Sequence, residues 1–381
     1  MTPARIAFVD HAPFVGGAET VLLDLVSHLD RARFDPLVFL PARSPLVPHL
    51  DTCGIHWCDL PLPRLNVRSP FTPFHWLSAA RRLAHLARQQ RVDLIHANTV
   101  RAHLVSAFIR HIPVVWMLHD DTFPRWLFKA LSRRPAQLIA NSRATARHYQ
   151  IDRHPKVSVV HNGVDTHRPP GDGLRFRRHI GVGPEKILIA HVGRLARWKG
   201  QHIFIRAAAR IAPAFPNAHF TLVGTFTKGD EALGVLGGGA TYHDALRKLA
   251  AALGLNDRLT FAGHQDNIAD VYAGIDVLVH SSTRPEPFGR VLIEAMAAAV
   301  PPIASDQGGP TEIVEDGVTG LLIAPGSSEL LAEAMSLLIR DSARRAEMGR
   351  AAQQRARERF DIRLQVERIQ SIYADVLRHR I

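Results

Sequence analysis

The chain contains very little cysteine and lacks any long apolar run. Cys53 and Cys58 are the two cysteines among 381 residues, and such a pair makes neither a disulfide framework nor a typical zinc site. We expect two ordinary thiols in a reducing cytoplasm. No apolar stretch reaches the roughly 18 residues that a membrane span needs. The first apolar run ends at Asp10, so we expect no secretory signal.

Acidic residues are scarce in the first half of the chain. The formal net charge is +12; residues 1–170 hold 21 Lys and Arg against 12 Asp and Glu, whereas residues 171–381 hold 26 against 23. This excess indicates an anionic partner, such as a membrane surface, an acidic acceptor or nucleic acid. A solvated, arginine-rich surface explains the charge equally well. Because no recognised nucleic-acid motif occurs, we expect no nucleic-acid partner.

Short apolar runs alternate with helix-length amphipathic stretches from the first residues onward. In residues 1–168 the pattern predicts strands at Ile6–Val9, Leu37–Leu40, Leu94–His96, Val114–Leu118 and Gln137–Ala140, and helices at Glu19–Leu29, Trp76–Arg88 and Ala102–Arg110. This order favours a parallel sheet with helices on both faces.

A second alternation follows the turn-forming residues of His161–Asp165 and Pro169–Gly173. The predicted strands are Ile187–Val192, Phe220–Val223, Leu259–Phe261, Val277–His280, Pro302–Ala304 and Gly320–Ile323. The predicted helices are Ile203–Ala214, Tyr242–Leu253, Val291–Ala298, Ser327–Arg340, Ala343–Phe360 and Leu364–Leu377. The sequence therefore predicts an α/β protein of two doubly wound Rossmann-like domains facing a central cleft, with ligands at the carboxyl ends of the strands. The glycine-rich stretch Lys228–Thr241 is expected to be a flexible insertion.

Two loops that follow predicted strands carry candidate phosphate-binding groups. Gly16 and Gly17 precede the first helix, where glycine allows close approach of a ligand and the helix N-terminus favours negative charge. An ordinary Gly–Gly turn is the alternative. At the matching position of the second domain, Arg194 and Lys199 can clamp a diphosphate without a metal. Two exposed basic residues would give the same pattern.

The most specific pattern follows the predicted strand Val277–His280. Glu286 lies in a proline-flanked loop, and Glu294 lies on the next helix, whose start at Phe288, Gly289 and Arg290 offers backbone donors. The first carboxylate can meet sugar hydroxyls and the second can reach ribose hydroxyls. A spacing of eight does not place both acids on one helix face, so it does not indicate the carboxylate pair of a glycoside hydrolase.

Together these motifs resemble glycosyltransferase family 4, whose members have the GT-B fold and retain anomeric configuration. Glu286 and Glu294, with seven residues between them, resemble the family signature. Four further parts of the chain match other family motifs in the same order: Gly16–Glu19 the N-terminal glycine loop, His161–Asp165 the interdomain turn, Gly193–Gly200 the diphosphate loop, and Gly308–Val314 with Gly317–Gly320 the C-terminal turn and strand. The resemblance covers almost the whole chain.

The resemblance implies a role for each matching residue. Arg194 and Lys199 hold the donor diphosphate, Glu286 contacts the transferred sugar, and Glu294 holds the ribose. Backbone contacts to the donor come from Phe288, Gly289, Arg290 and Val291, while Gly16 and Gly17 let the phosphates approach the first helix. His119 resembles the histidine that touches the donor sugar, although without the family a structural role is favoured. Asn141–Arg143 is also family-like. The chain has Ala299 where the family usually has glycine, and we expect only a local change there.

The implied reaction moves a sugar, with retention, from a UDP-sugar or GDP-sugar to an acceptor hydroxyl. It serves bacterial cell-surface polysaccharide, lipopolysaccharide or glycolipid synthesis, and it needs no metal and no other cofactor. The acceptor is a glycan or glycolipid, and the leaving phosphate takes its proton. A sugar-nucleotide epimerase and a non-catalytic sugar-nucleotide-binding subunit are the alternatives.

The resemblance also divides the chain into domains. Residues 1–168 form the acceptor-side domain, residues 180–360 the donor-binding domain, and residues 361–381 a helix that packs back on the first. Pro124–Arg134 mixes Trp126 and Phe128 with basic residues and can lie on an anionic membrane. Alternatively, its apolar residues face the core. We expect a cytoplasmic protein, peripheral at the inner face of the cell membrane.

Overall fold

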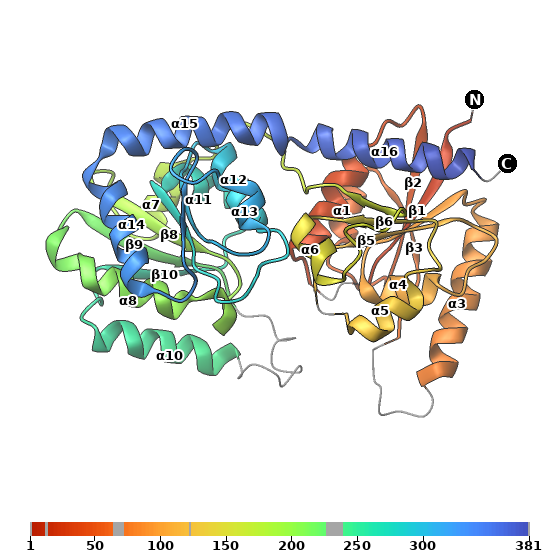
Figure 1. Ribbon diagram of the computed structural model, residues 1–381, viewed down its shortest axis with the longest axis horizontal. Helices are drawn as coiled ribbons and strands as arrows, with labels where there is room; N and C mark the ends of the chain where they lie inside the picture. The colour runs from red at the N-terminus through yellow and green to blue at the C-terminus, as the bar shows by residue number, and fades with distance from the viewer. Residues whose placement is uncertain (1, 12–13, 64–71, 122, 226–238, 380–381) are drawn as a thin grey trace. The chain divides into compact units, whose positions relative to one another are not determined.

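The chain divides into two compact units, each built on a parallel sheet (Figure 1). The computed structural model describes residues 2–11, 14–63, 72–121, 123–225 and 239–379. Unit 1 comprises Met1–Gly163 and Ile362–Ile381, and unit 2 comprises Val164–Asp361. The predicted pair of doubly wound α/β units is confirmed.

The sheet of unit 1 has the order β3-β2-β1-β4-β5-β6-β7. Its strands are β1 (Ala4–Val9), β2 (Phe34–Leu40), β3 (His56–Asp59), β4 (Leu94–Ala97), β5 (Val114–Leu118), β6 (Gln137–Ala140) and β7 (Val157–Val159). All neighbours pair in parallel, and β1 lies between β2 and β4 with Ile6 opposite Leu94. The chain therefore builds one half of the sheet outward from β1 and then crosses to the other side.

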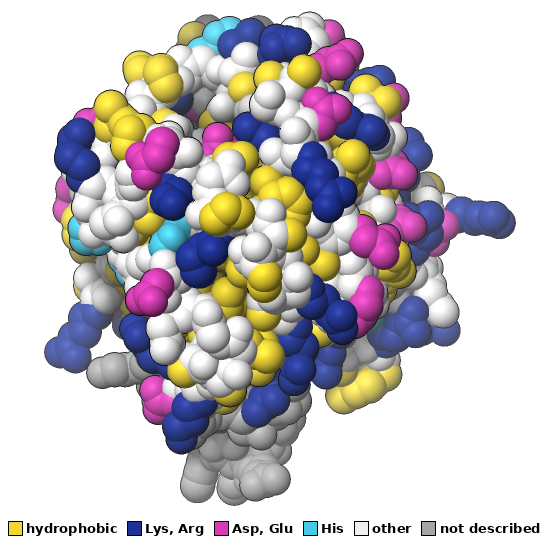
Figure 2. All heavy atoms as spheres, turned by 90° about the vertical axis from the view of Figure 1, so that its left-hand side faces the viewer, with side chains coloured by type: hydrophobic (Ala, Val, Ile, Leu, Met, Phe, Trp, Pro, Cys, Tyr) yellow, Lys and Arg dark blue, Asp and Glu magenta, His cyan; other side chains and the backbone are white. Residues whose placement is uncertain are grey.

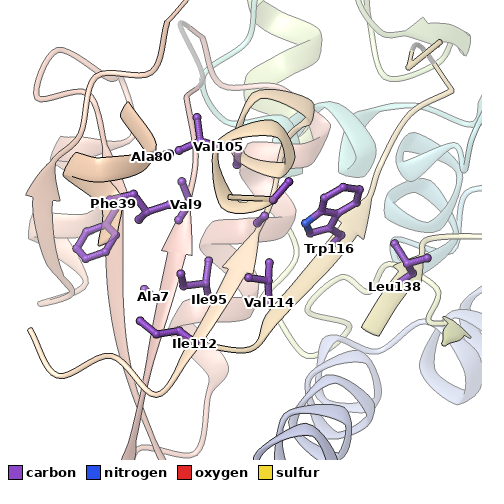
Figure 3. Packing of buried hydrophobic residues seen from close by; sticks show 14 of the residues in the cluster. Ala7, Val9, Phe39, Ala80, Ile95, Val105, Ile112, Val114, Trp116 and Leu138 are labelled. Carbon is purple, nitrogen blue, oxygen red and sulfur yellow. The ribbon is translucent and has the colours of Figure 1, made fainter. Parts of the chain in front are cut away.

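Alternating side chains of these strands fill two apolar layers. Ala7, Val9, Phe39 and Trp116 point to one face (Figure 3), which is covered by α3 (Thr72–Gln89), α4 (Val100–Ser106), α5 (Arg125–Leu131) and α6 (Arg143–His148). The opposite face packs against α1 (Gly17–His28), α2 (Val47–Thr52) and α16 (Ile362–Arg378). Strands buried on both faces are continuously apolar, which is why the sequence pattern located most of them.

Helix α16 packs against α1 in unit 1. Val366, Ile369 and Tyr373 are buried in the apolar layer that also holds residues of β1. The Tyr373 hydroxyl lies 2.6 Å from Nδ1 of His96, and the side-chain oxygen of Gln365 accepts a hydrogen bond from the Gly163 amide at 2.7 Å. The last helix of the chain is therefore held on the first unit by both apolar and polar contacts.

The sheet of unit 2 has the order β10-β9-β8-β11-β12-β13 and is also parallel. Its strands are β8 (Ile187–Val192), β9 (Ala218–Val223), β10 (Leu259–Gly263), β11 (Val277–His280), β12 (Pro302–Ser305) and β13 (Leu321–Ile323). One face packs against α8 (Gln201–Ile211), α10 (Gly239–Ala252) and α14 (Ser328–Arg340), and the other against α7 (Gly173–His179), α11 (Ile268–Gly274), α12 (Arg290–Ala297) and α15 (Ser342–Arg359). The 3₁₀ turns η1 (Arg197–Lys199) and η2 (Ala212–Ala214) and the short helix α13 (Pro310–Ile313) complete the unit.

Several short elements were missed by the sequence pattern, namely α2, β3, α5, α6, β7, α7, α11 and α13. The helix predicted over Ala102–Arg110 ends earlier, because α4 stops at Ser106. Residues 226–238, which hold most of the predicted insertion, lie outside the described residues, and α10 begins at Gly239. Among the described helices, none combines the length and the apolarity needed to cross a bilayer.

Candidate functional site

Both sheets reverse their strand order next to the first strand of the unit, between β1 and β4 and between β8 and β11. In open parallel sheets, ligands bind outside the carboxyl ends of the strands at such a switch point. Gly16 and Gly17 follow β1, Arg194 and Lys199 follow β8, and Glu286 follows β11. The predicted site residues of each unit thus gather where this topology places a ligand.

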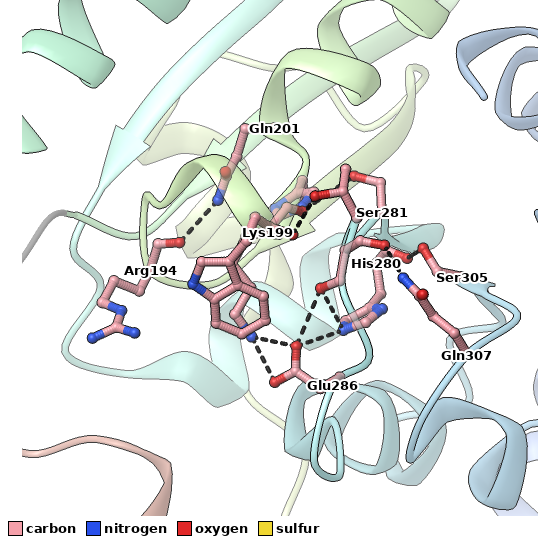
Figure 4. Close-up of polar contacts among 12 residues, drawn as sticks. Arg194, Lys199, Gln201, His280, Ser281, Glu286, Ser305 and Gln307 are labelled. Atoms are coloured by element: carbon pink, nitrogen blue, oxygen red, sulfur yellow. Dashed lines mark hydrogen bonds and ion pairs between the residues drawn. The ribbon is translucent and has the colours of Figure 1, made fainter. Parts of the chain in front are cut away.

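In unit 2, Lys199 and Glu286 form a close ion pair (Figure 4). Nζ of Lys199 lies 2.7 Å from both carboxylate oxygens of Glu286, and the two side chains are only 17% and 12% exposed. The ammonium also lies 4.3 Å from the ring centroid of Trp198. Two residues that the sequence assigned to different parts of a donor are therefore in direct contact.

The carboxylate of Glu286 has two further partners that sequence reasoning missed. Its Oε2 lies 3.2 Å from Nε2 of His280 and accepts a hydrogen bond from the Ser282 hydroxyl at 3.1 Å. Burial alone would raise the pKa of Glu286, but the Lys199 ammonium and the His280 ring outweigh it and hold the pKa well below its usual range. Glu286 is therefore an ionised acceptor for hydroxyl groups and not a proton donor. Both partners could have been found in the sequence from their position at the carboxyl end of the strand that became β11.

The glycines of the predicted C-terminal turn shape the loop around Glu286. The Gly309 amide donates to the Glu286 carbonyl oxygen at 2.7 Å. Gly308 has a φ of +69°, and a Cβ there would overlap the backbone of Glu286. At the start of α12, Gly289 has a φ of +102°. These positions need glycine because of left-handed backbone and close backbone approach.

The loop after β8 carries Arg194 and Lys199 on different sides. The carbonyl oxygen of Arg194 accepts a hydrogen bond from Gln201 at 2.9 Å, and its guanidinium extends apart from the Lys199–Glu286 pair (Figure 4). The loop leans on the segment after β11, because the Thr283 amide donates to the Trp198 carbonyl at 2.7 Å. The two predicted diphosphate ligands therefore share one loop, but only Lys199 pairs with Glu286.

Glu294, on α12, is held by two neighbours. Its Oε1 accepts from Nε of Arg290 at 2.7 Å, and its Oε2 accepts from the Tyr272 hydroxyl at 2.8 Å. A carboxylate has about four lone-pair sites, so both contacts are compatible with ribose binding. Tyr272 comes from α11, a helix that the sequence pattern did not reveal, and it was therefore missed.

The predicted backbone donors lie at the N-terminus of α12. The Phe288 side chain is buried and packs edge-on against Phe360, with ring centroids 6.2 Å apart, so this residue can offer a ligand only its backbone. Gly289 is the N-cap residue, and Arg290 and Val291 are the first residues of the helix. The amides of a first helical turn have no acceptor within the helix and favour anions.

In unit 1, the two glycines after β1 differ in their surroundings. The Gly16 amide donates to Oε2 of Glu19 at 2.9 Å, and a Cβ on Gly16 would press on Glu19 and Phe14. Gly17 is exposed, and a Cβ there meets no atom within 4 Å. Burial, together with the charge of Asp10, raises the pKa of Glu19 to about 7. The structure therefore leaves space for a ligand at Gly17 and not at Gly16.

His119 follows β5 and is held from both sides. Its Nε2 lies 2.8 Å from Oδ1 of Asn98, and its carbonyl oxygen accepts from Nδ2 of Asn141 at 3.1 Å. Asn141 is the first residue of the family-like Asn141–Arg143 segment, whereas Asn98 was not predicted. Asn98 and His119 are 21 residues apart in the sequence, and no sequence pattern links them. They meet because β4 and β5 are neighbours in the sheet.

The segment predicted to touch a membrane divides into exposed and buried side chains. Trp126 is 74% exposed, whereas Phe128 is 1% exposed and stacks on Tyr149 with ring centroids 4.2 Å apart. Leu127 and Leu131 are partly buried against the core. The prediction that Phe128 can insert into a membrane is wrong, because its ring completes the apolar layer of unit 1.

Comparisons with known proteins match both units. Residues 15–168 match the family model described as Glycosyltransferase Family 4, and residues 174–355 match Glycosyl transferases group 1. The solved structure of Anabaena Alr3699/HepE in complex with UDP and glucose is 30% identical, with a TM-score of 0.83, covering 97% of this chain and 99% of that one.

Curated relatives include two bacterial transferases. The lipopolysaccharide core biosynthesis mannosyltransferase LpsB of Rhizobium meliloti is 30% identical over 66% of this chain and 68% of its own length. The D-inositol 3-phosphate glycosyltransferase of Nocardia farcinica is 31% identical over 72% of this chain. The match spans 59% of the Nocardia protein, less than two thirds of its length.

Proposed function

Because the chain belongs to glycosyltransferase family 4 and has the GT-B fold, we propose that it moves a sugar from a nucleoside-diphosphate sugar to an acceptor hydroxyl with retention of configuration. The observation that carries this proposal is the buried Lys199–Glu286 pair at the switch point of unit 2. The ionised carboxylate can accept hydrogen bonds from the sugar hydroxyls, and the cation beside it can bind the diphosphate that leaves.

Each site residue has a distinct part in the proposed reaction. Lys199 and Arg194 bind the diphosphate and stabilise the charge that develops as it leaves. Glu286 accepts hydrogen bonds from the transferred sugar, and Glu294 accepts them from the ribose. The amides of Gly289, Arg290 and Val291 add donors at a helix N-terminus, and in unit 1 Gly17 and His119 contact the donor.

The donor is a UDP-sugar or a GDP-sugar, and we favour uridine. The support is the likeness to Alr3699/HepE, which is described in complexes with UDP, with UDP and glucose, and with UDP-glucose. We propose that no metal is needed, because two cations and a helix N-terminus supply the positive charge that a metal would bring to the diphosphate.

The acceptor that we propose is a cell-surface glycan or glycolipid, met at an anionic membrane. LpsB, named as a lipopolysaccharide core mannosyltransferase, supports the class of acceptor. The exposed apolar side chains of unit 1 support the membrane: Trp126, Phe74 and Leu77 lie on α5 and α3, and Phe108 follows α4. These three helices cover the same face of the sheet. Apolar side chains among basic ones are suited to an anionic lipid interface.

A donor screen with purified protein tests the proposal. Hydrolysis of several UDP- and GDP-sugars is measured in EDTA, with and without added Mn²⁺. We expect turnover of at least one donor in EDTA, with release of the nucleoside diphosphate. Turnover that requires Mn²⁺ contradicts the metal-free proposal. Isomerised sugar nucleotide as the product points to an epimerase, and binding without any turnover to a non-catalytic subunit.

A further inference from the structure

Four polar residues form a continuous hydrogen-bonded row along one edge of the unit 1 sheet. Asp10, Asn98, His119 and Asn141 each follow the last residue of a strand, namely β1, β4, β5 and β6, and these four strands are neighbours in the sheet. Asn98 donates to Asp10 at 2.7 Å and contacts His119 at 2.8 Å, and Asn141 donates to the His119 carbonyl at 3.1 Å. The sheet order therefore builds the row.

The orientation of the Asn98 amide is determined by its partners. Its Nδ2 lies 2.7 Å from Oδ2 of Asp10 and 3.4 Å from the carbonyl oxygen of Ala18. A main-chain carbonyl oxygen can only accept a hydrogen bond, so the amino group of Asn98 must face these two oxygens. The amide oxygen is then turned toward His119. Asn98 is 2% exposed, and burial makes the alternative orientation, with two acceptors facing each other, costly.

The orientation of the amide in turn fixes the proton on the imidazole. An amide oxygen is an acceptor only, so Nε2 of His119 must carry hydrogen to bond with it. In a neutral ring the other nitrogen, Nδ1, then has a lone pair. Asn141 holds the main chain of the same residue, and its own Oδ1 accepts from the Thr145 hydroxyl at 2.7 Å. Ring and backbone of His119 are thus both tied to the sheet edge.

We propose that Asn98 is a positioning residue which, oriented by Asp10 and Ala18, holds His119 as the Nε2–H tautomer and so makes its Nδ1 an acceptor for a donor-sugar hydroxyl. The part that concerns the sugar rests on the proposed function. The tautomer itself rests only on the contacts within unit 1. Asp10 acts through Asn98, so its contribution to the orientation of the ring is indirect.

Two-bond ¹H–¹⁵N spectra of ¹⁵N-histidine-labelled protein at about pH 8, where most imidazoles are neutral, read the tautomer without turnover. The His119 signals are identified by their loss in His119→Gln. We expect a protonated Nε2 and an unprotonated Nδ1 in the wild type, and a shift toward a tautomer mixture in Asn98→Leu. His103 is an internal control, because its Nε2 lies 3.1 Å from the carbonyl oxygens of Ala97 and Met117 and should keep its tautomer.

Two further variants separate positioning from general damage to the fold. Asp10→Asn keeps the shape of the side chain but can offer a donor to Asn98, which lets the Asn98 amide turn over. We therefore expect a partial loss of the Nε2–H tautomer in this variant, and the measurement remains possible if Asn98→Leu fails to fold. Asn141→Ala removes a contact to the main chain and should leave the tautomer unchanged. A wild-type ring protonated at Nδ1, or unchanged ring signals in both Asn98→Leu and Asp10→Asn, would overturn the inference.

Measuring kcat/KM with donors that each lack one sugar hydroxyl tests whether the His119 tautomer affects binding of the sugar. Asn98→Leu should lower kcat/KM for the full donor about tenfold, as expected for roughly 1.4 kcal/mol. The deoxy analogue that lacks the hydroxyl facing His119 should show no such loss, and an equal loss with every analogue would overturn the sugar part. A wild type without any donor turnover contradicts the proposed function, while the spectra still decide the tautomer.

Discussion

Glu19 is a buried acid whose titration should be visible in the stability of unit 1. Burial and the nearby charge of Asp10 raise its pKa from the ordinary 4.5 to about 7. The unfolded chain therefore loses this proton at lower pH than the folded chain, and the free energy of unfolding should fall as pH rises from about 4 to about 8, through the folded pKa. At roughly 1.4 kcal/mol per pKa unit, the fall is about 3 kcal/mol.

The variant Glu19→Gln keeps an oxygen for the Gly16 amide and removes the titration. Urea unfolding at about pH 5 and pH 8 should show the wild type losing stability relative to Glu19→Gln at the higher pH. Glu367→Gln, at an exposed position of α16, is the matched control and should follow the wild type. A difference between wild type and Glu19→Gln that does not change with pH would show that Glu19 titrates normally.

Gly17 offers a test of the predicted glycine loop. Since a Cβ at this position meets no atom within 4 Å, Gly17→Ala should fold normally and keep or slightly raise the melting temperature, because alanine favours helix. If donor phosphates approach this backbone, the added methyl group should weaken donor binding about tenfold, or roughly 1.4 kcal/mol.

Gly16→Ala is the comparison for this prediction, because its Cβ would lie 3.0 Å from a Glu19 oxygen and 3.1 Å from Phe14. We expect this variant to lose stability. Calorimetric titration with UDP and GDP, together with thermal melting, measures both effects. Unchanged nucleotide affinity in Gly17→Ala would remove Gly17 from the site.

Sequence reasoning located the charged site residues but not their partners. Lys199 and Glu286 stand out because they occur in loops after apolar runs. Tyr272 does not, because its helix was not predicted. Asn98 also follows an apolar run, but it meets His119 only through the fold. For the same reason Trp126 and Phe128 look alike in sequence, although one is exposed and the other completes the core.

Helix α12 ends in a turn that explains why the family usually has glycine where this chain has Ala299. The Val300 amide donates to the Ala295 carbonyl and the Ala299 amide to the Met296 carbonyl, which together form a Schellman motif. Ala299 has a φ of +60°, a left-handed conformation that costs an L-residue roughly 1–2 kcal/mol. The family's glycine fits this position because it has no Cβ.

Ala299→Gly should therefore stabilise unit 2 by about 1 kcal/mol, which corresponds to a rise in melting temperature of about 2–4 °C. Ala298→Gly is the matched control: its φ is −86°, so glycine there adds only unfolded-state entropy and should lower the melting temperature. Differential scanning calorimetry measures both. A lower melting temperature in Ala299→Gly would contradict the assignment of backbone strain to this residue.

The length of a helix or strand largely determines whether it could be predicted from the sequence. Strands β5, β6, β8 and β11 are found with their observed bounds, since each is a largely apolar run between polar loops. Helices α2, α6, α7 and α11 have six or seven residues, too few for a helical period to stand out. Their formation depends on packing against the sheets, which local sequence does not encode.

The charge of the whole molecule is unevenly distributed, and this determines where a membrane would attach. Residues 1–170 carry 21 basic against 12 acidic side chains. On the face of the second unit seen in Figure 2, basic and acidic side chains are intermixed. Each basic group near an anionic leaflet contributes about 1 kcal/mol. Unit 1, with its exposed Trp126, is therefore the part expected to bind lipid.

Sedimentation with anionic and neutral vesicles tests this attachment. Arg133→Glu/Arg134→Glu should reduce binding to anionic vesicles at least tenfold, and the binding should weaken with salt. Trp126→Ser should remove a salt-resistant remainder, whereas Leu337→Ser, on α14 of unit 2, should not. If the wild type does not bind anionic vesicles at low salt, the basic residues form only a solvated surface. A soluble acceptor then replaces the membrane-bound one.

The Lys199–Glu286 pair is the feature on which the whole account depends, and donor turnover by Glu286→Gln tests it most directly. Glutamine keeps an oxygen for Lys199 but removes the charge and leaves the buried ammonium without its anion, so the melting temperature should fall while the protein still folds and binds nucleotide. Turnover should fall roughly 100-fold, as when one stabilising group is lost from an active site. Glu315→Gln, an acid 56% exposed on the surface of unit 2, should keep the wild-type rate. A folded Glu286→Gln protein that turns over donor at the wild-type rate would contradict this role of the pair.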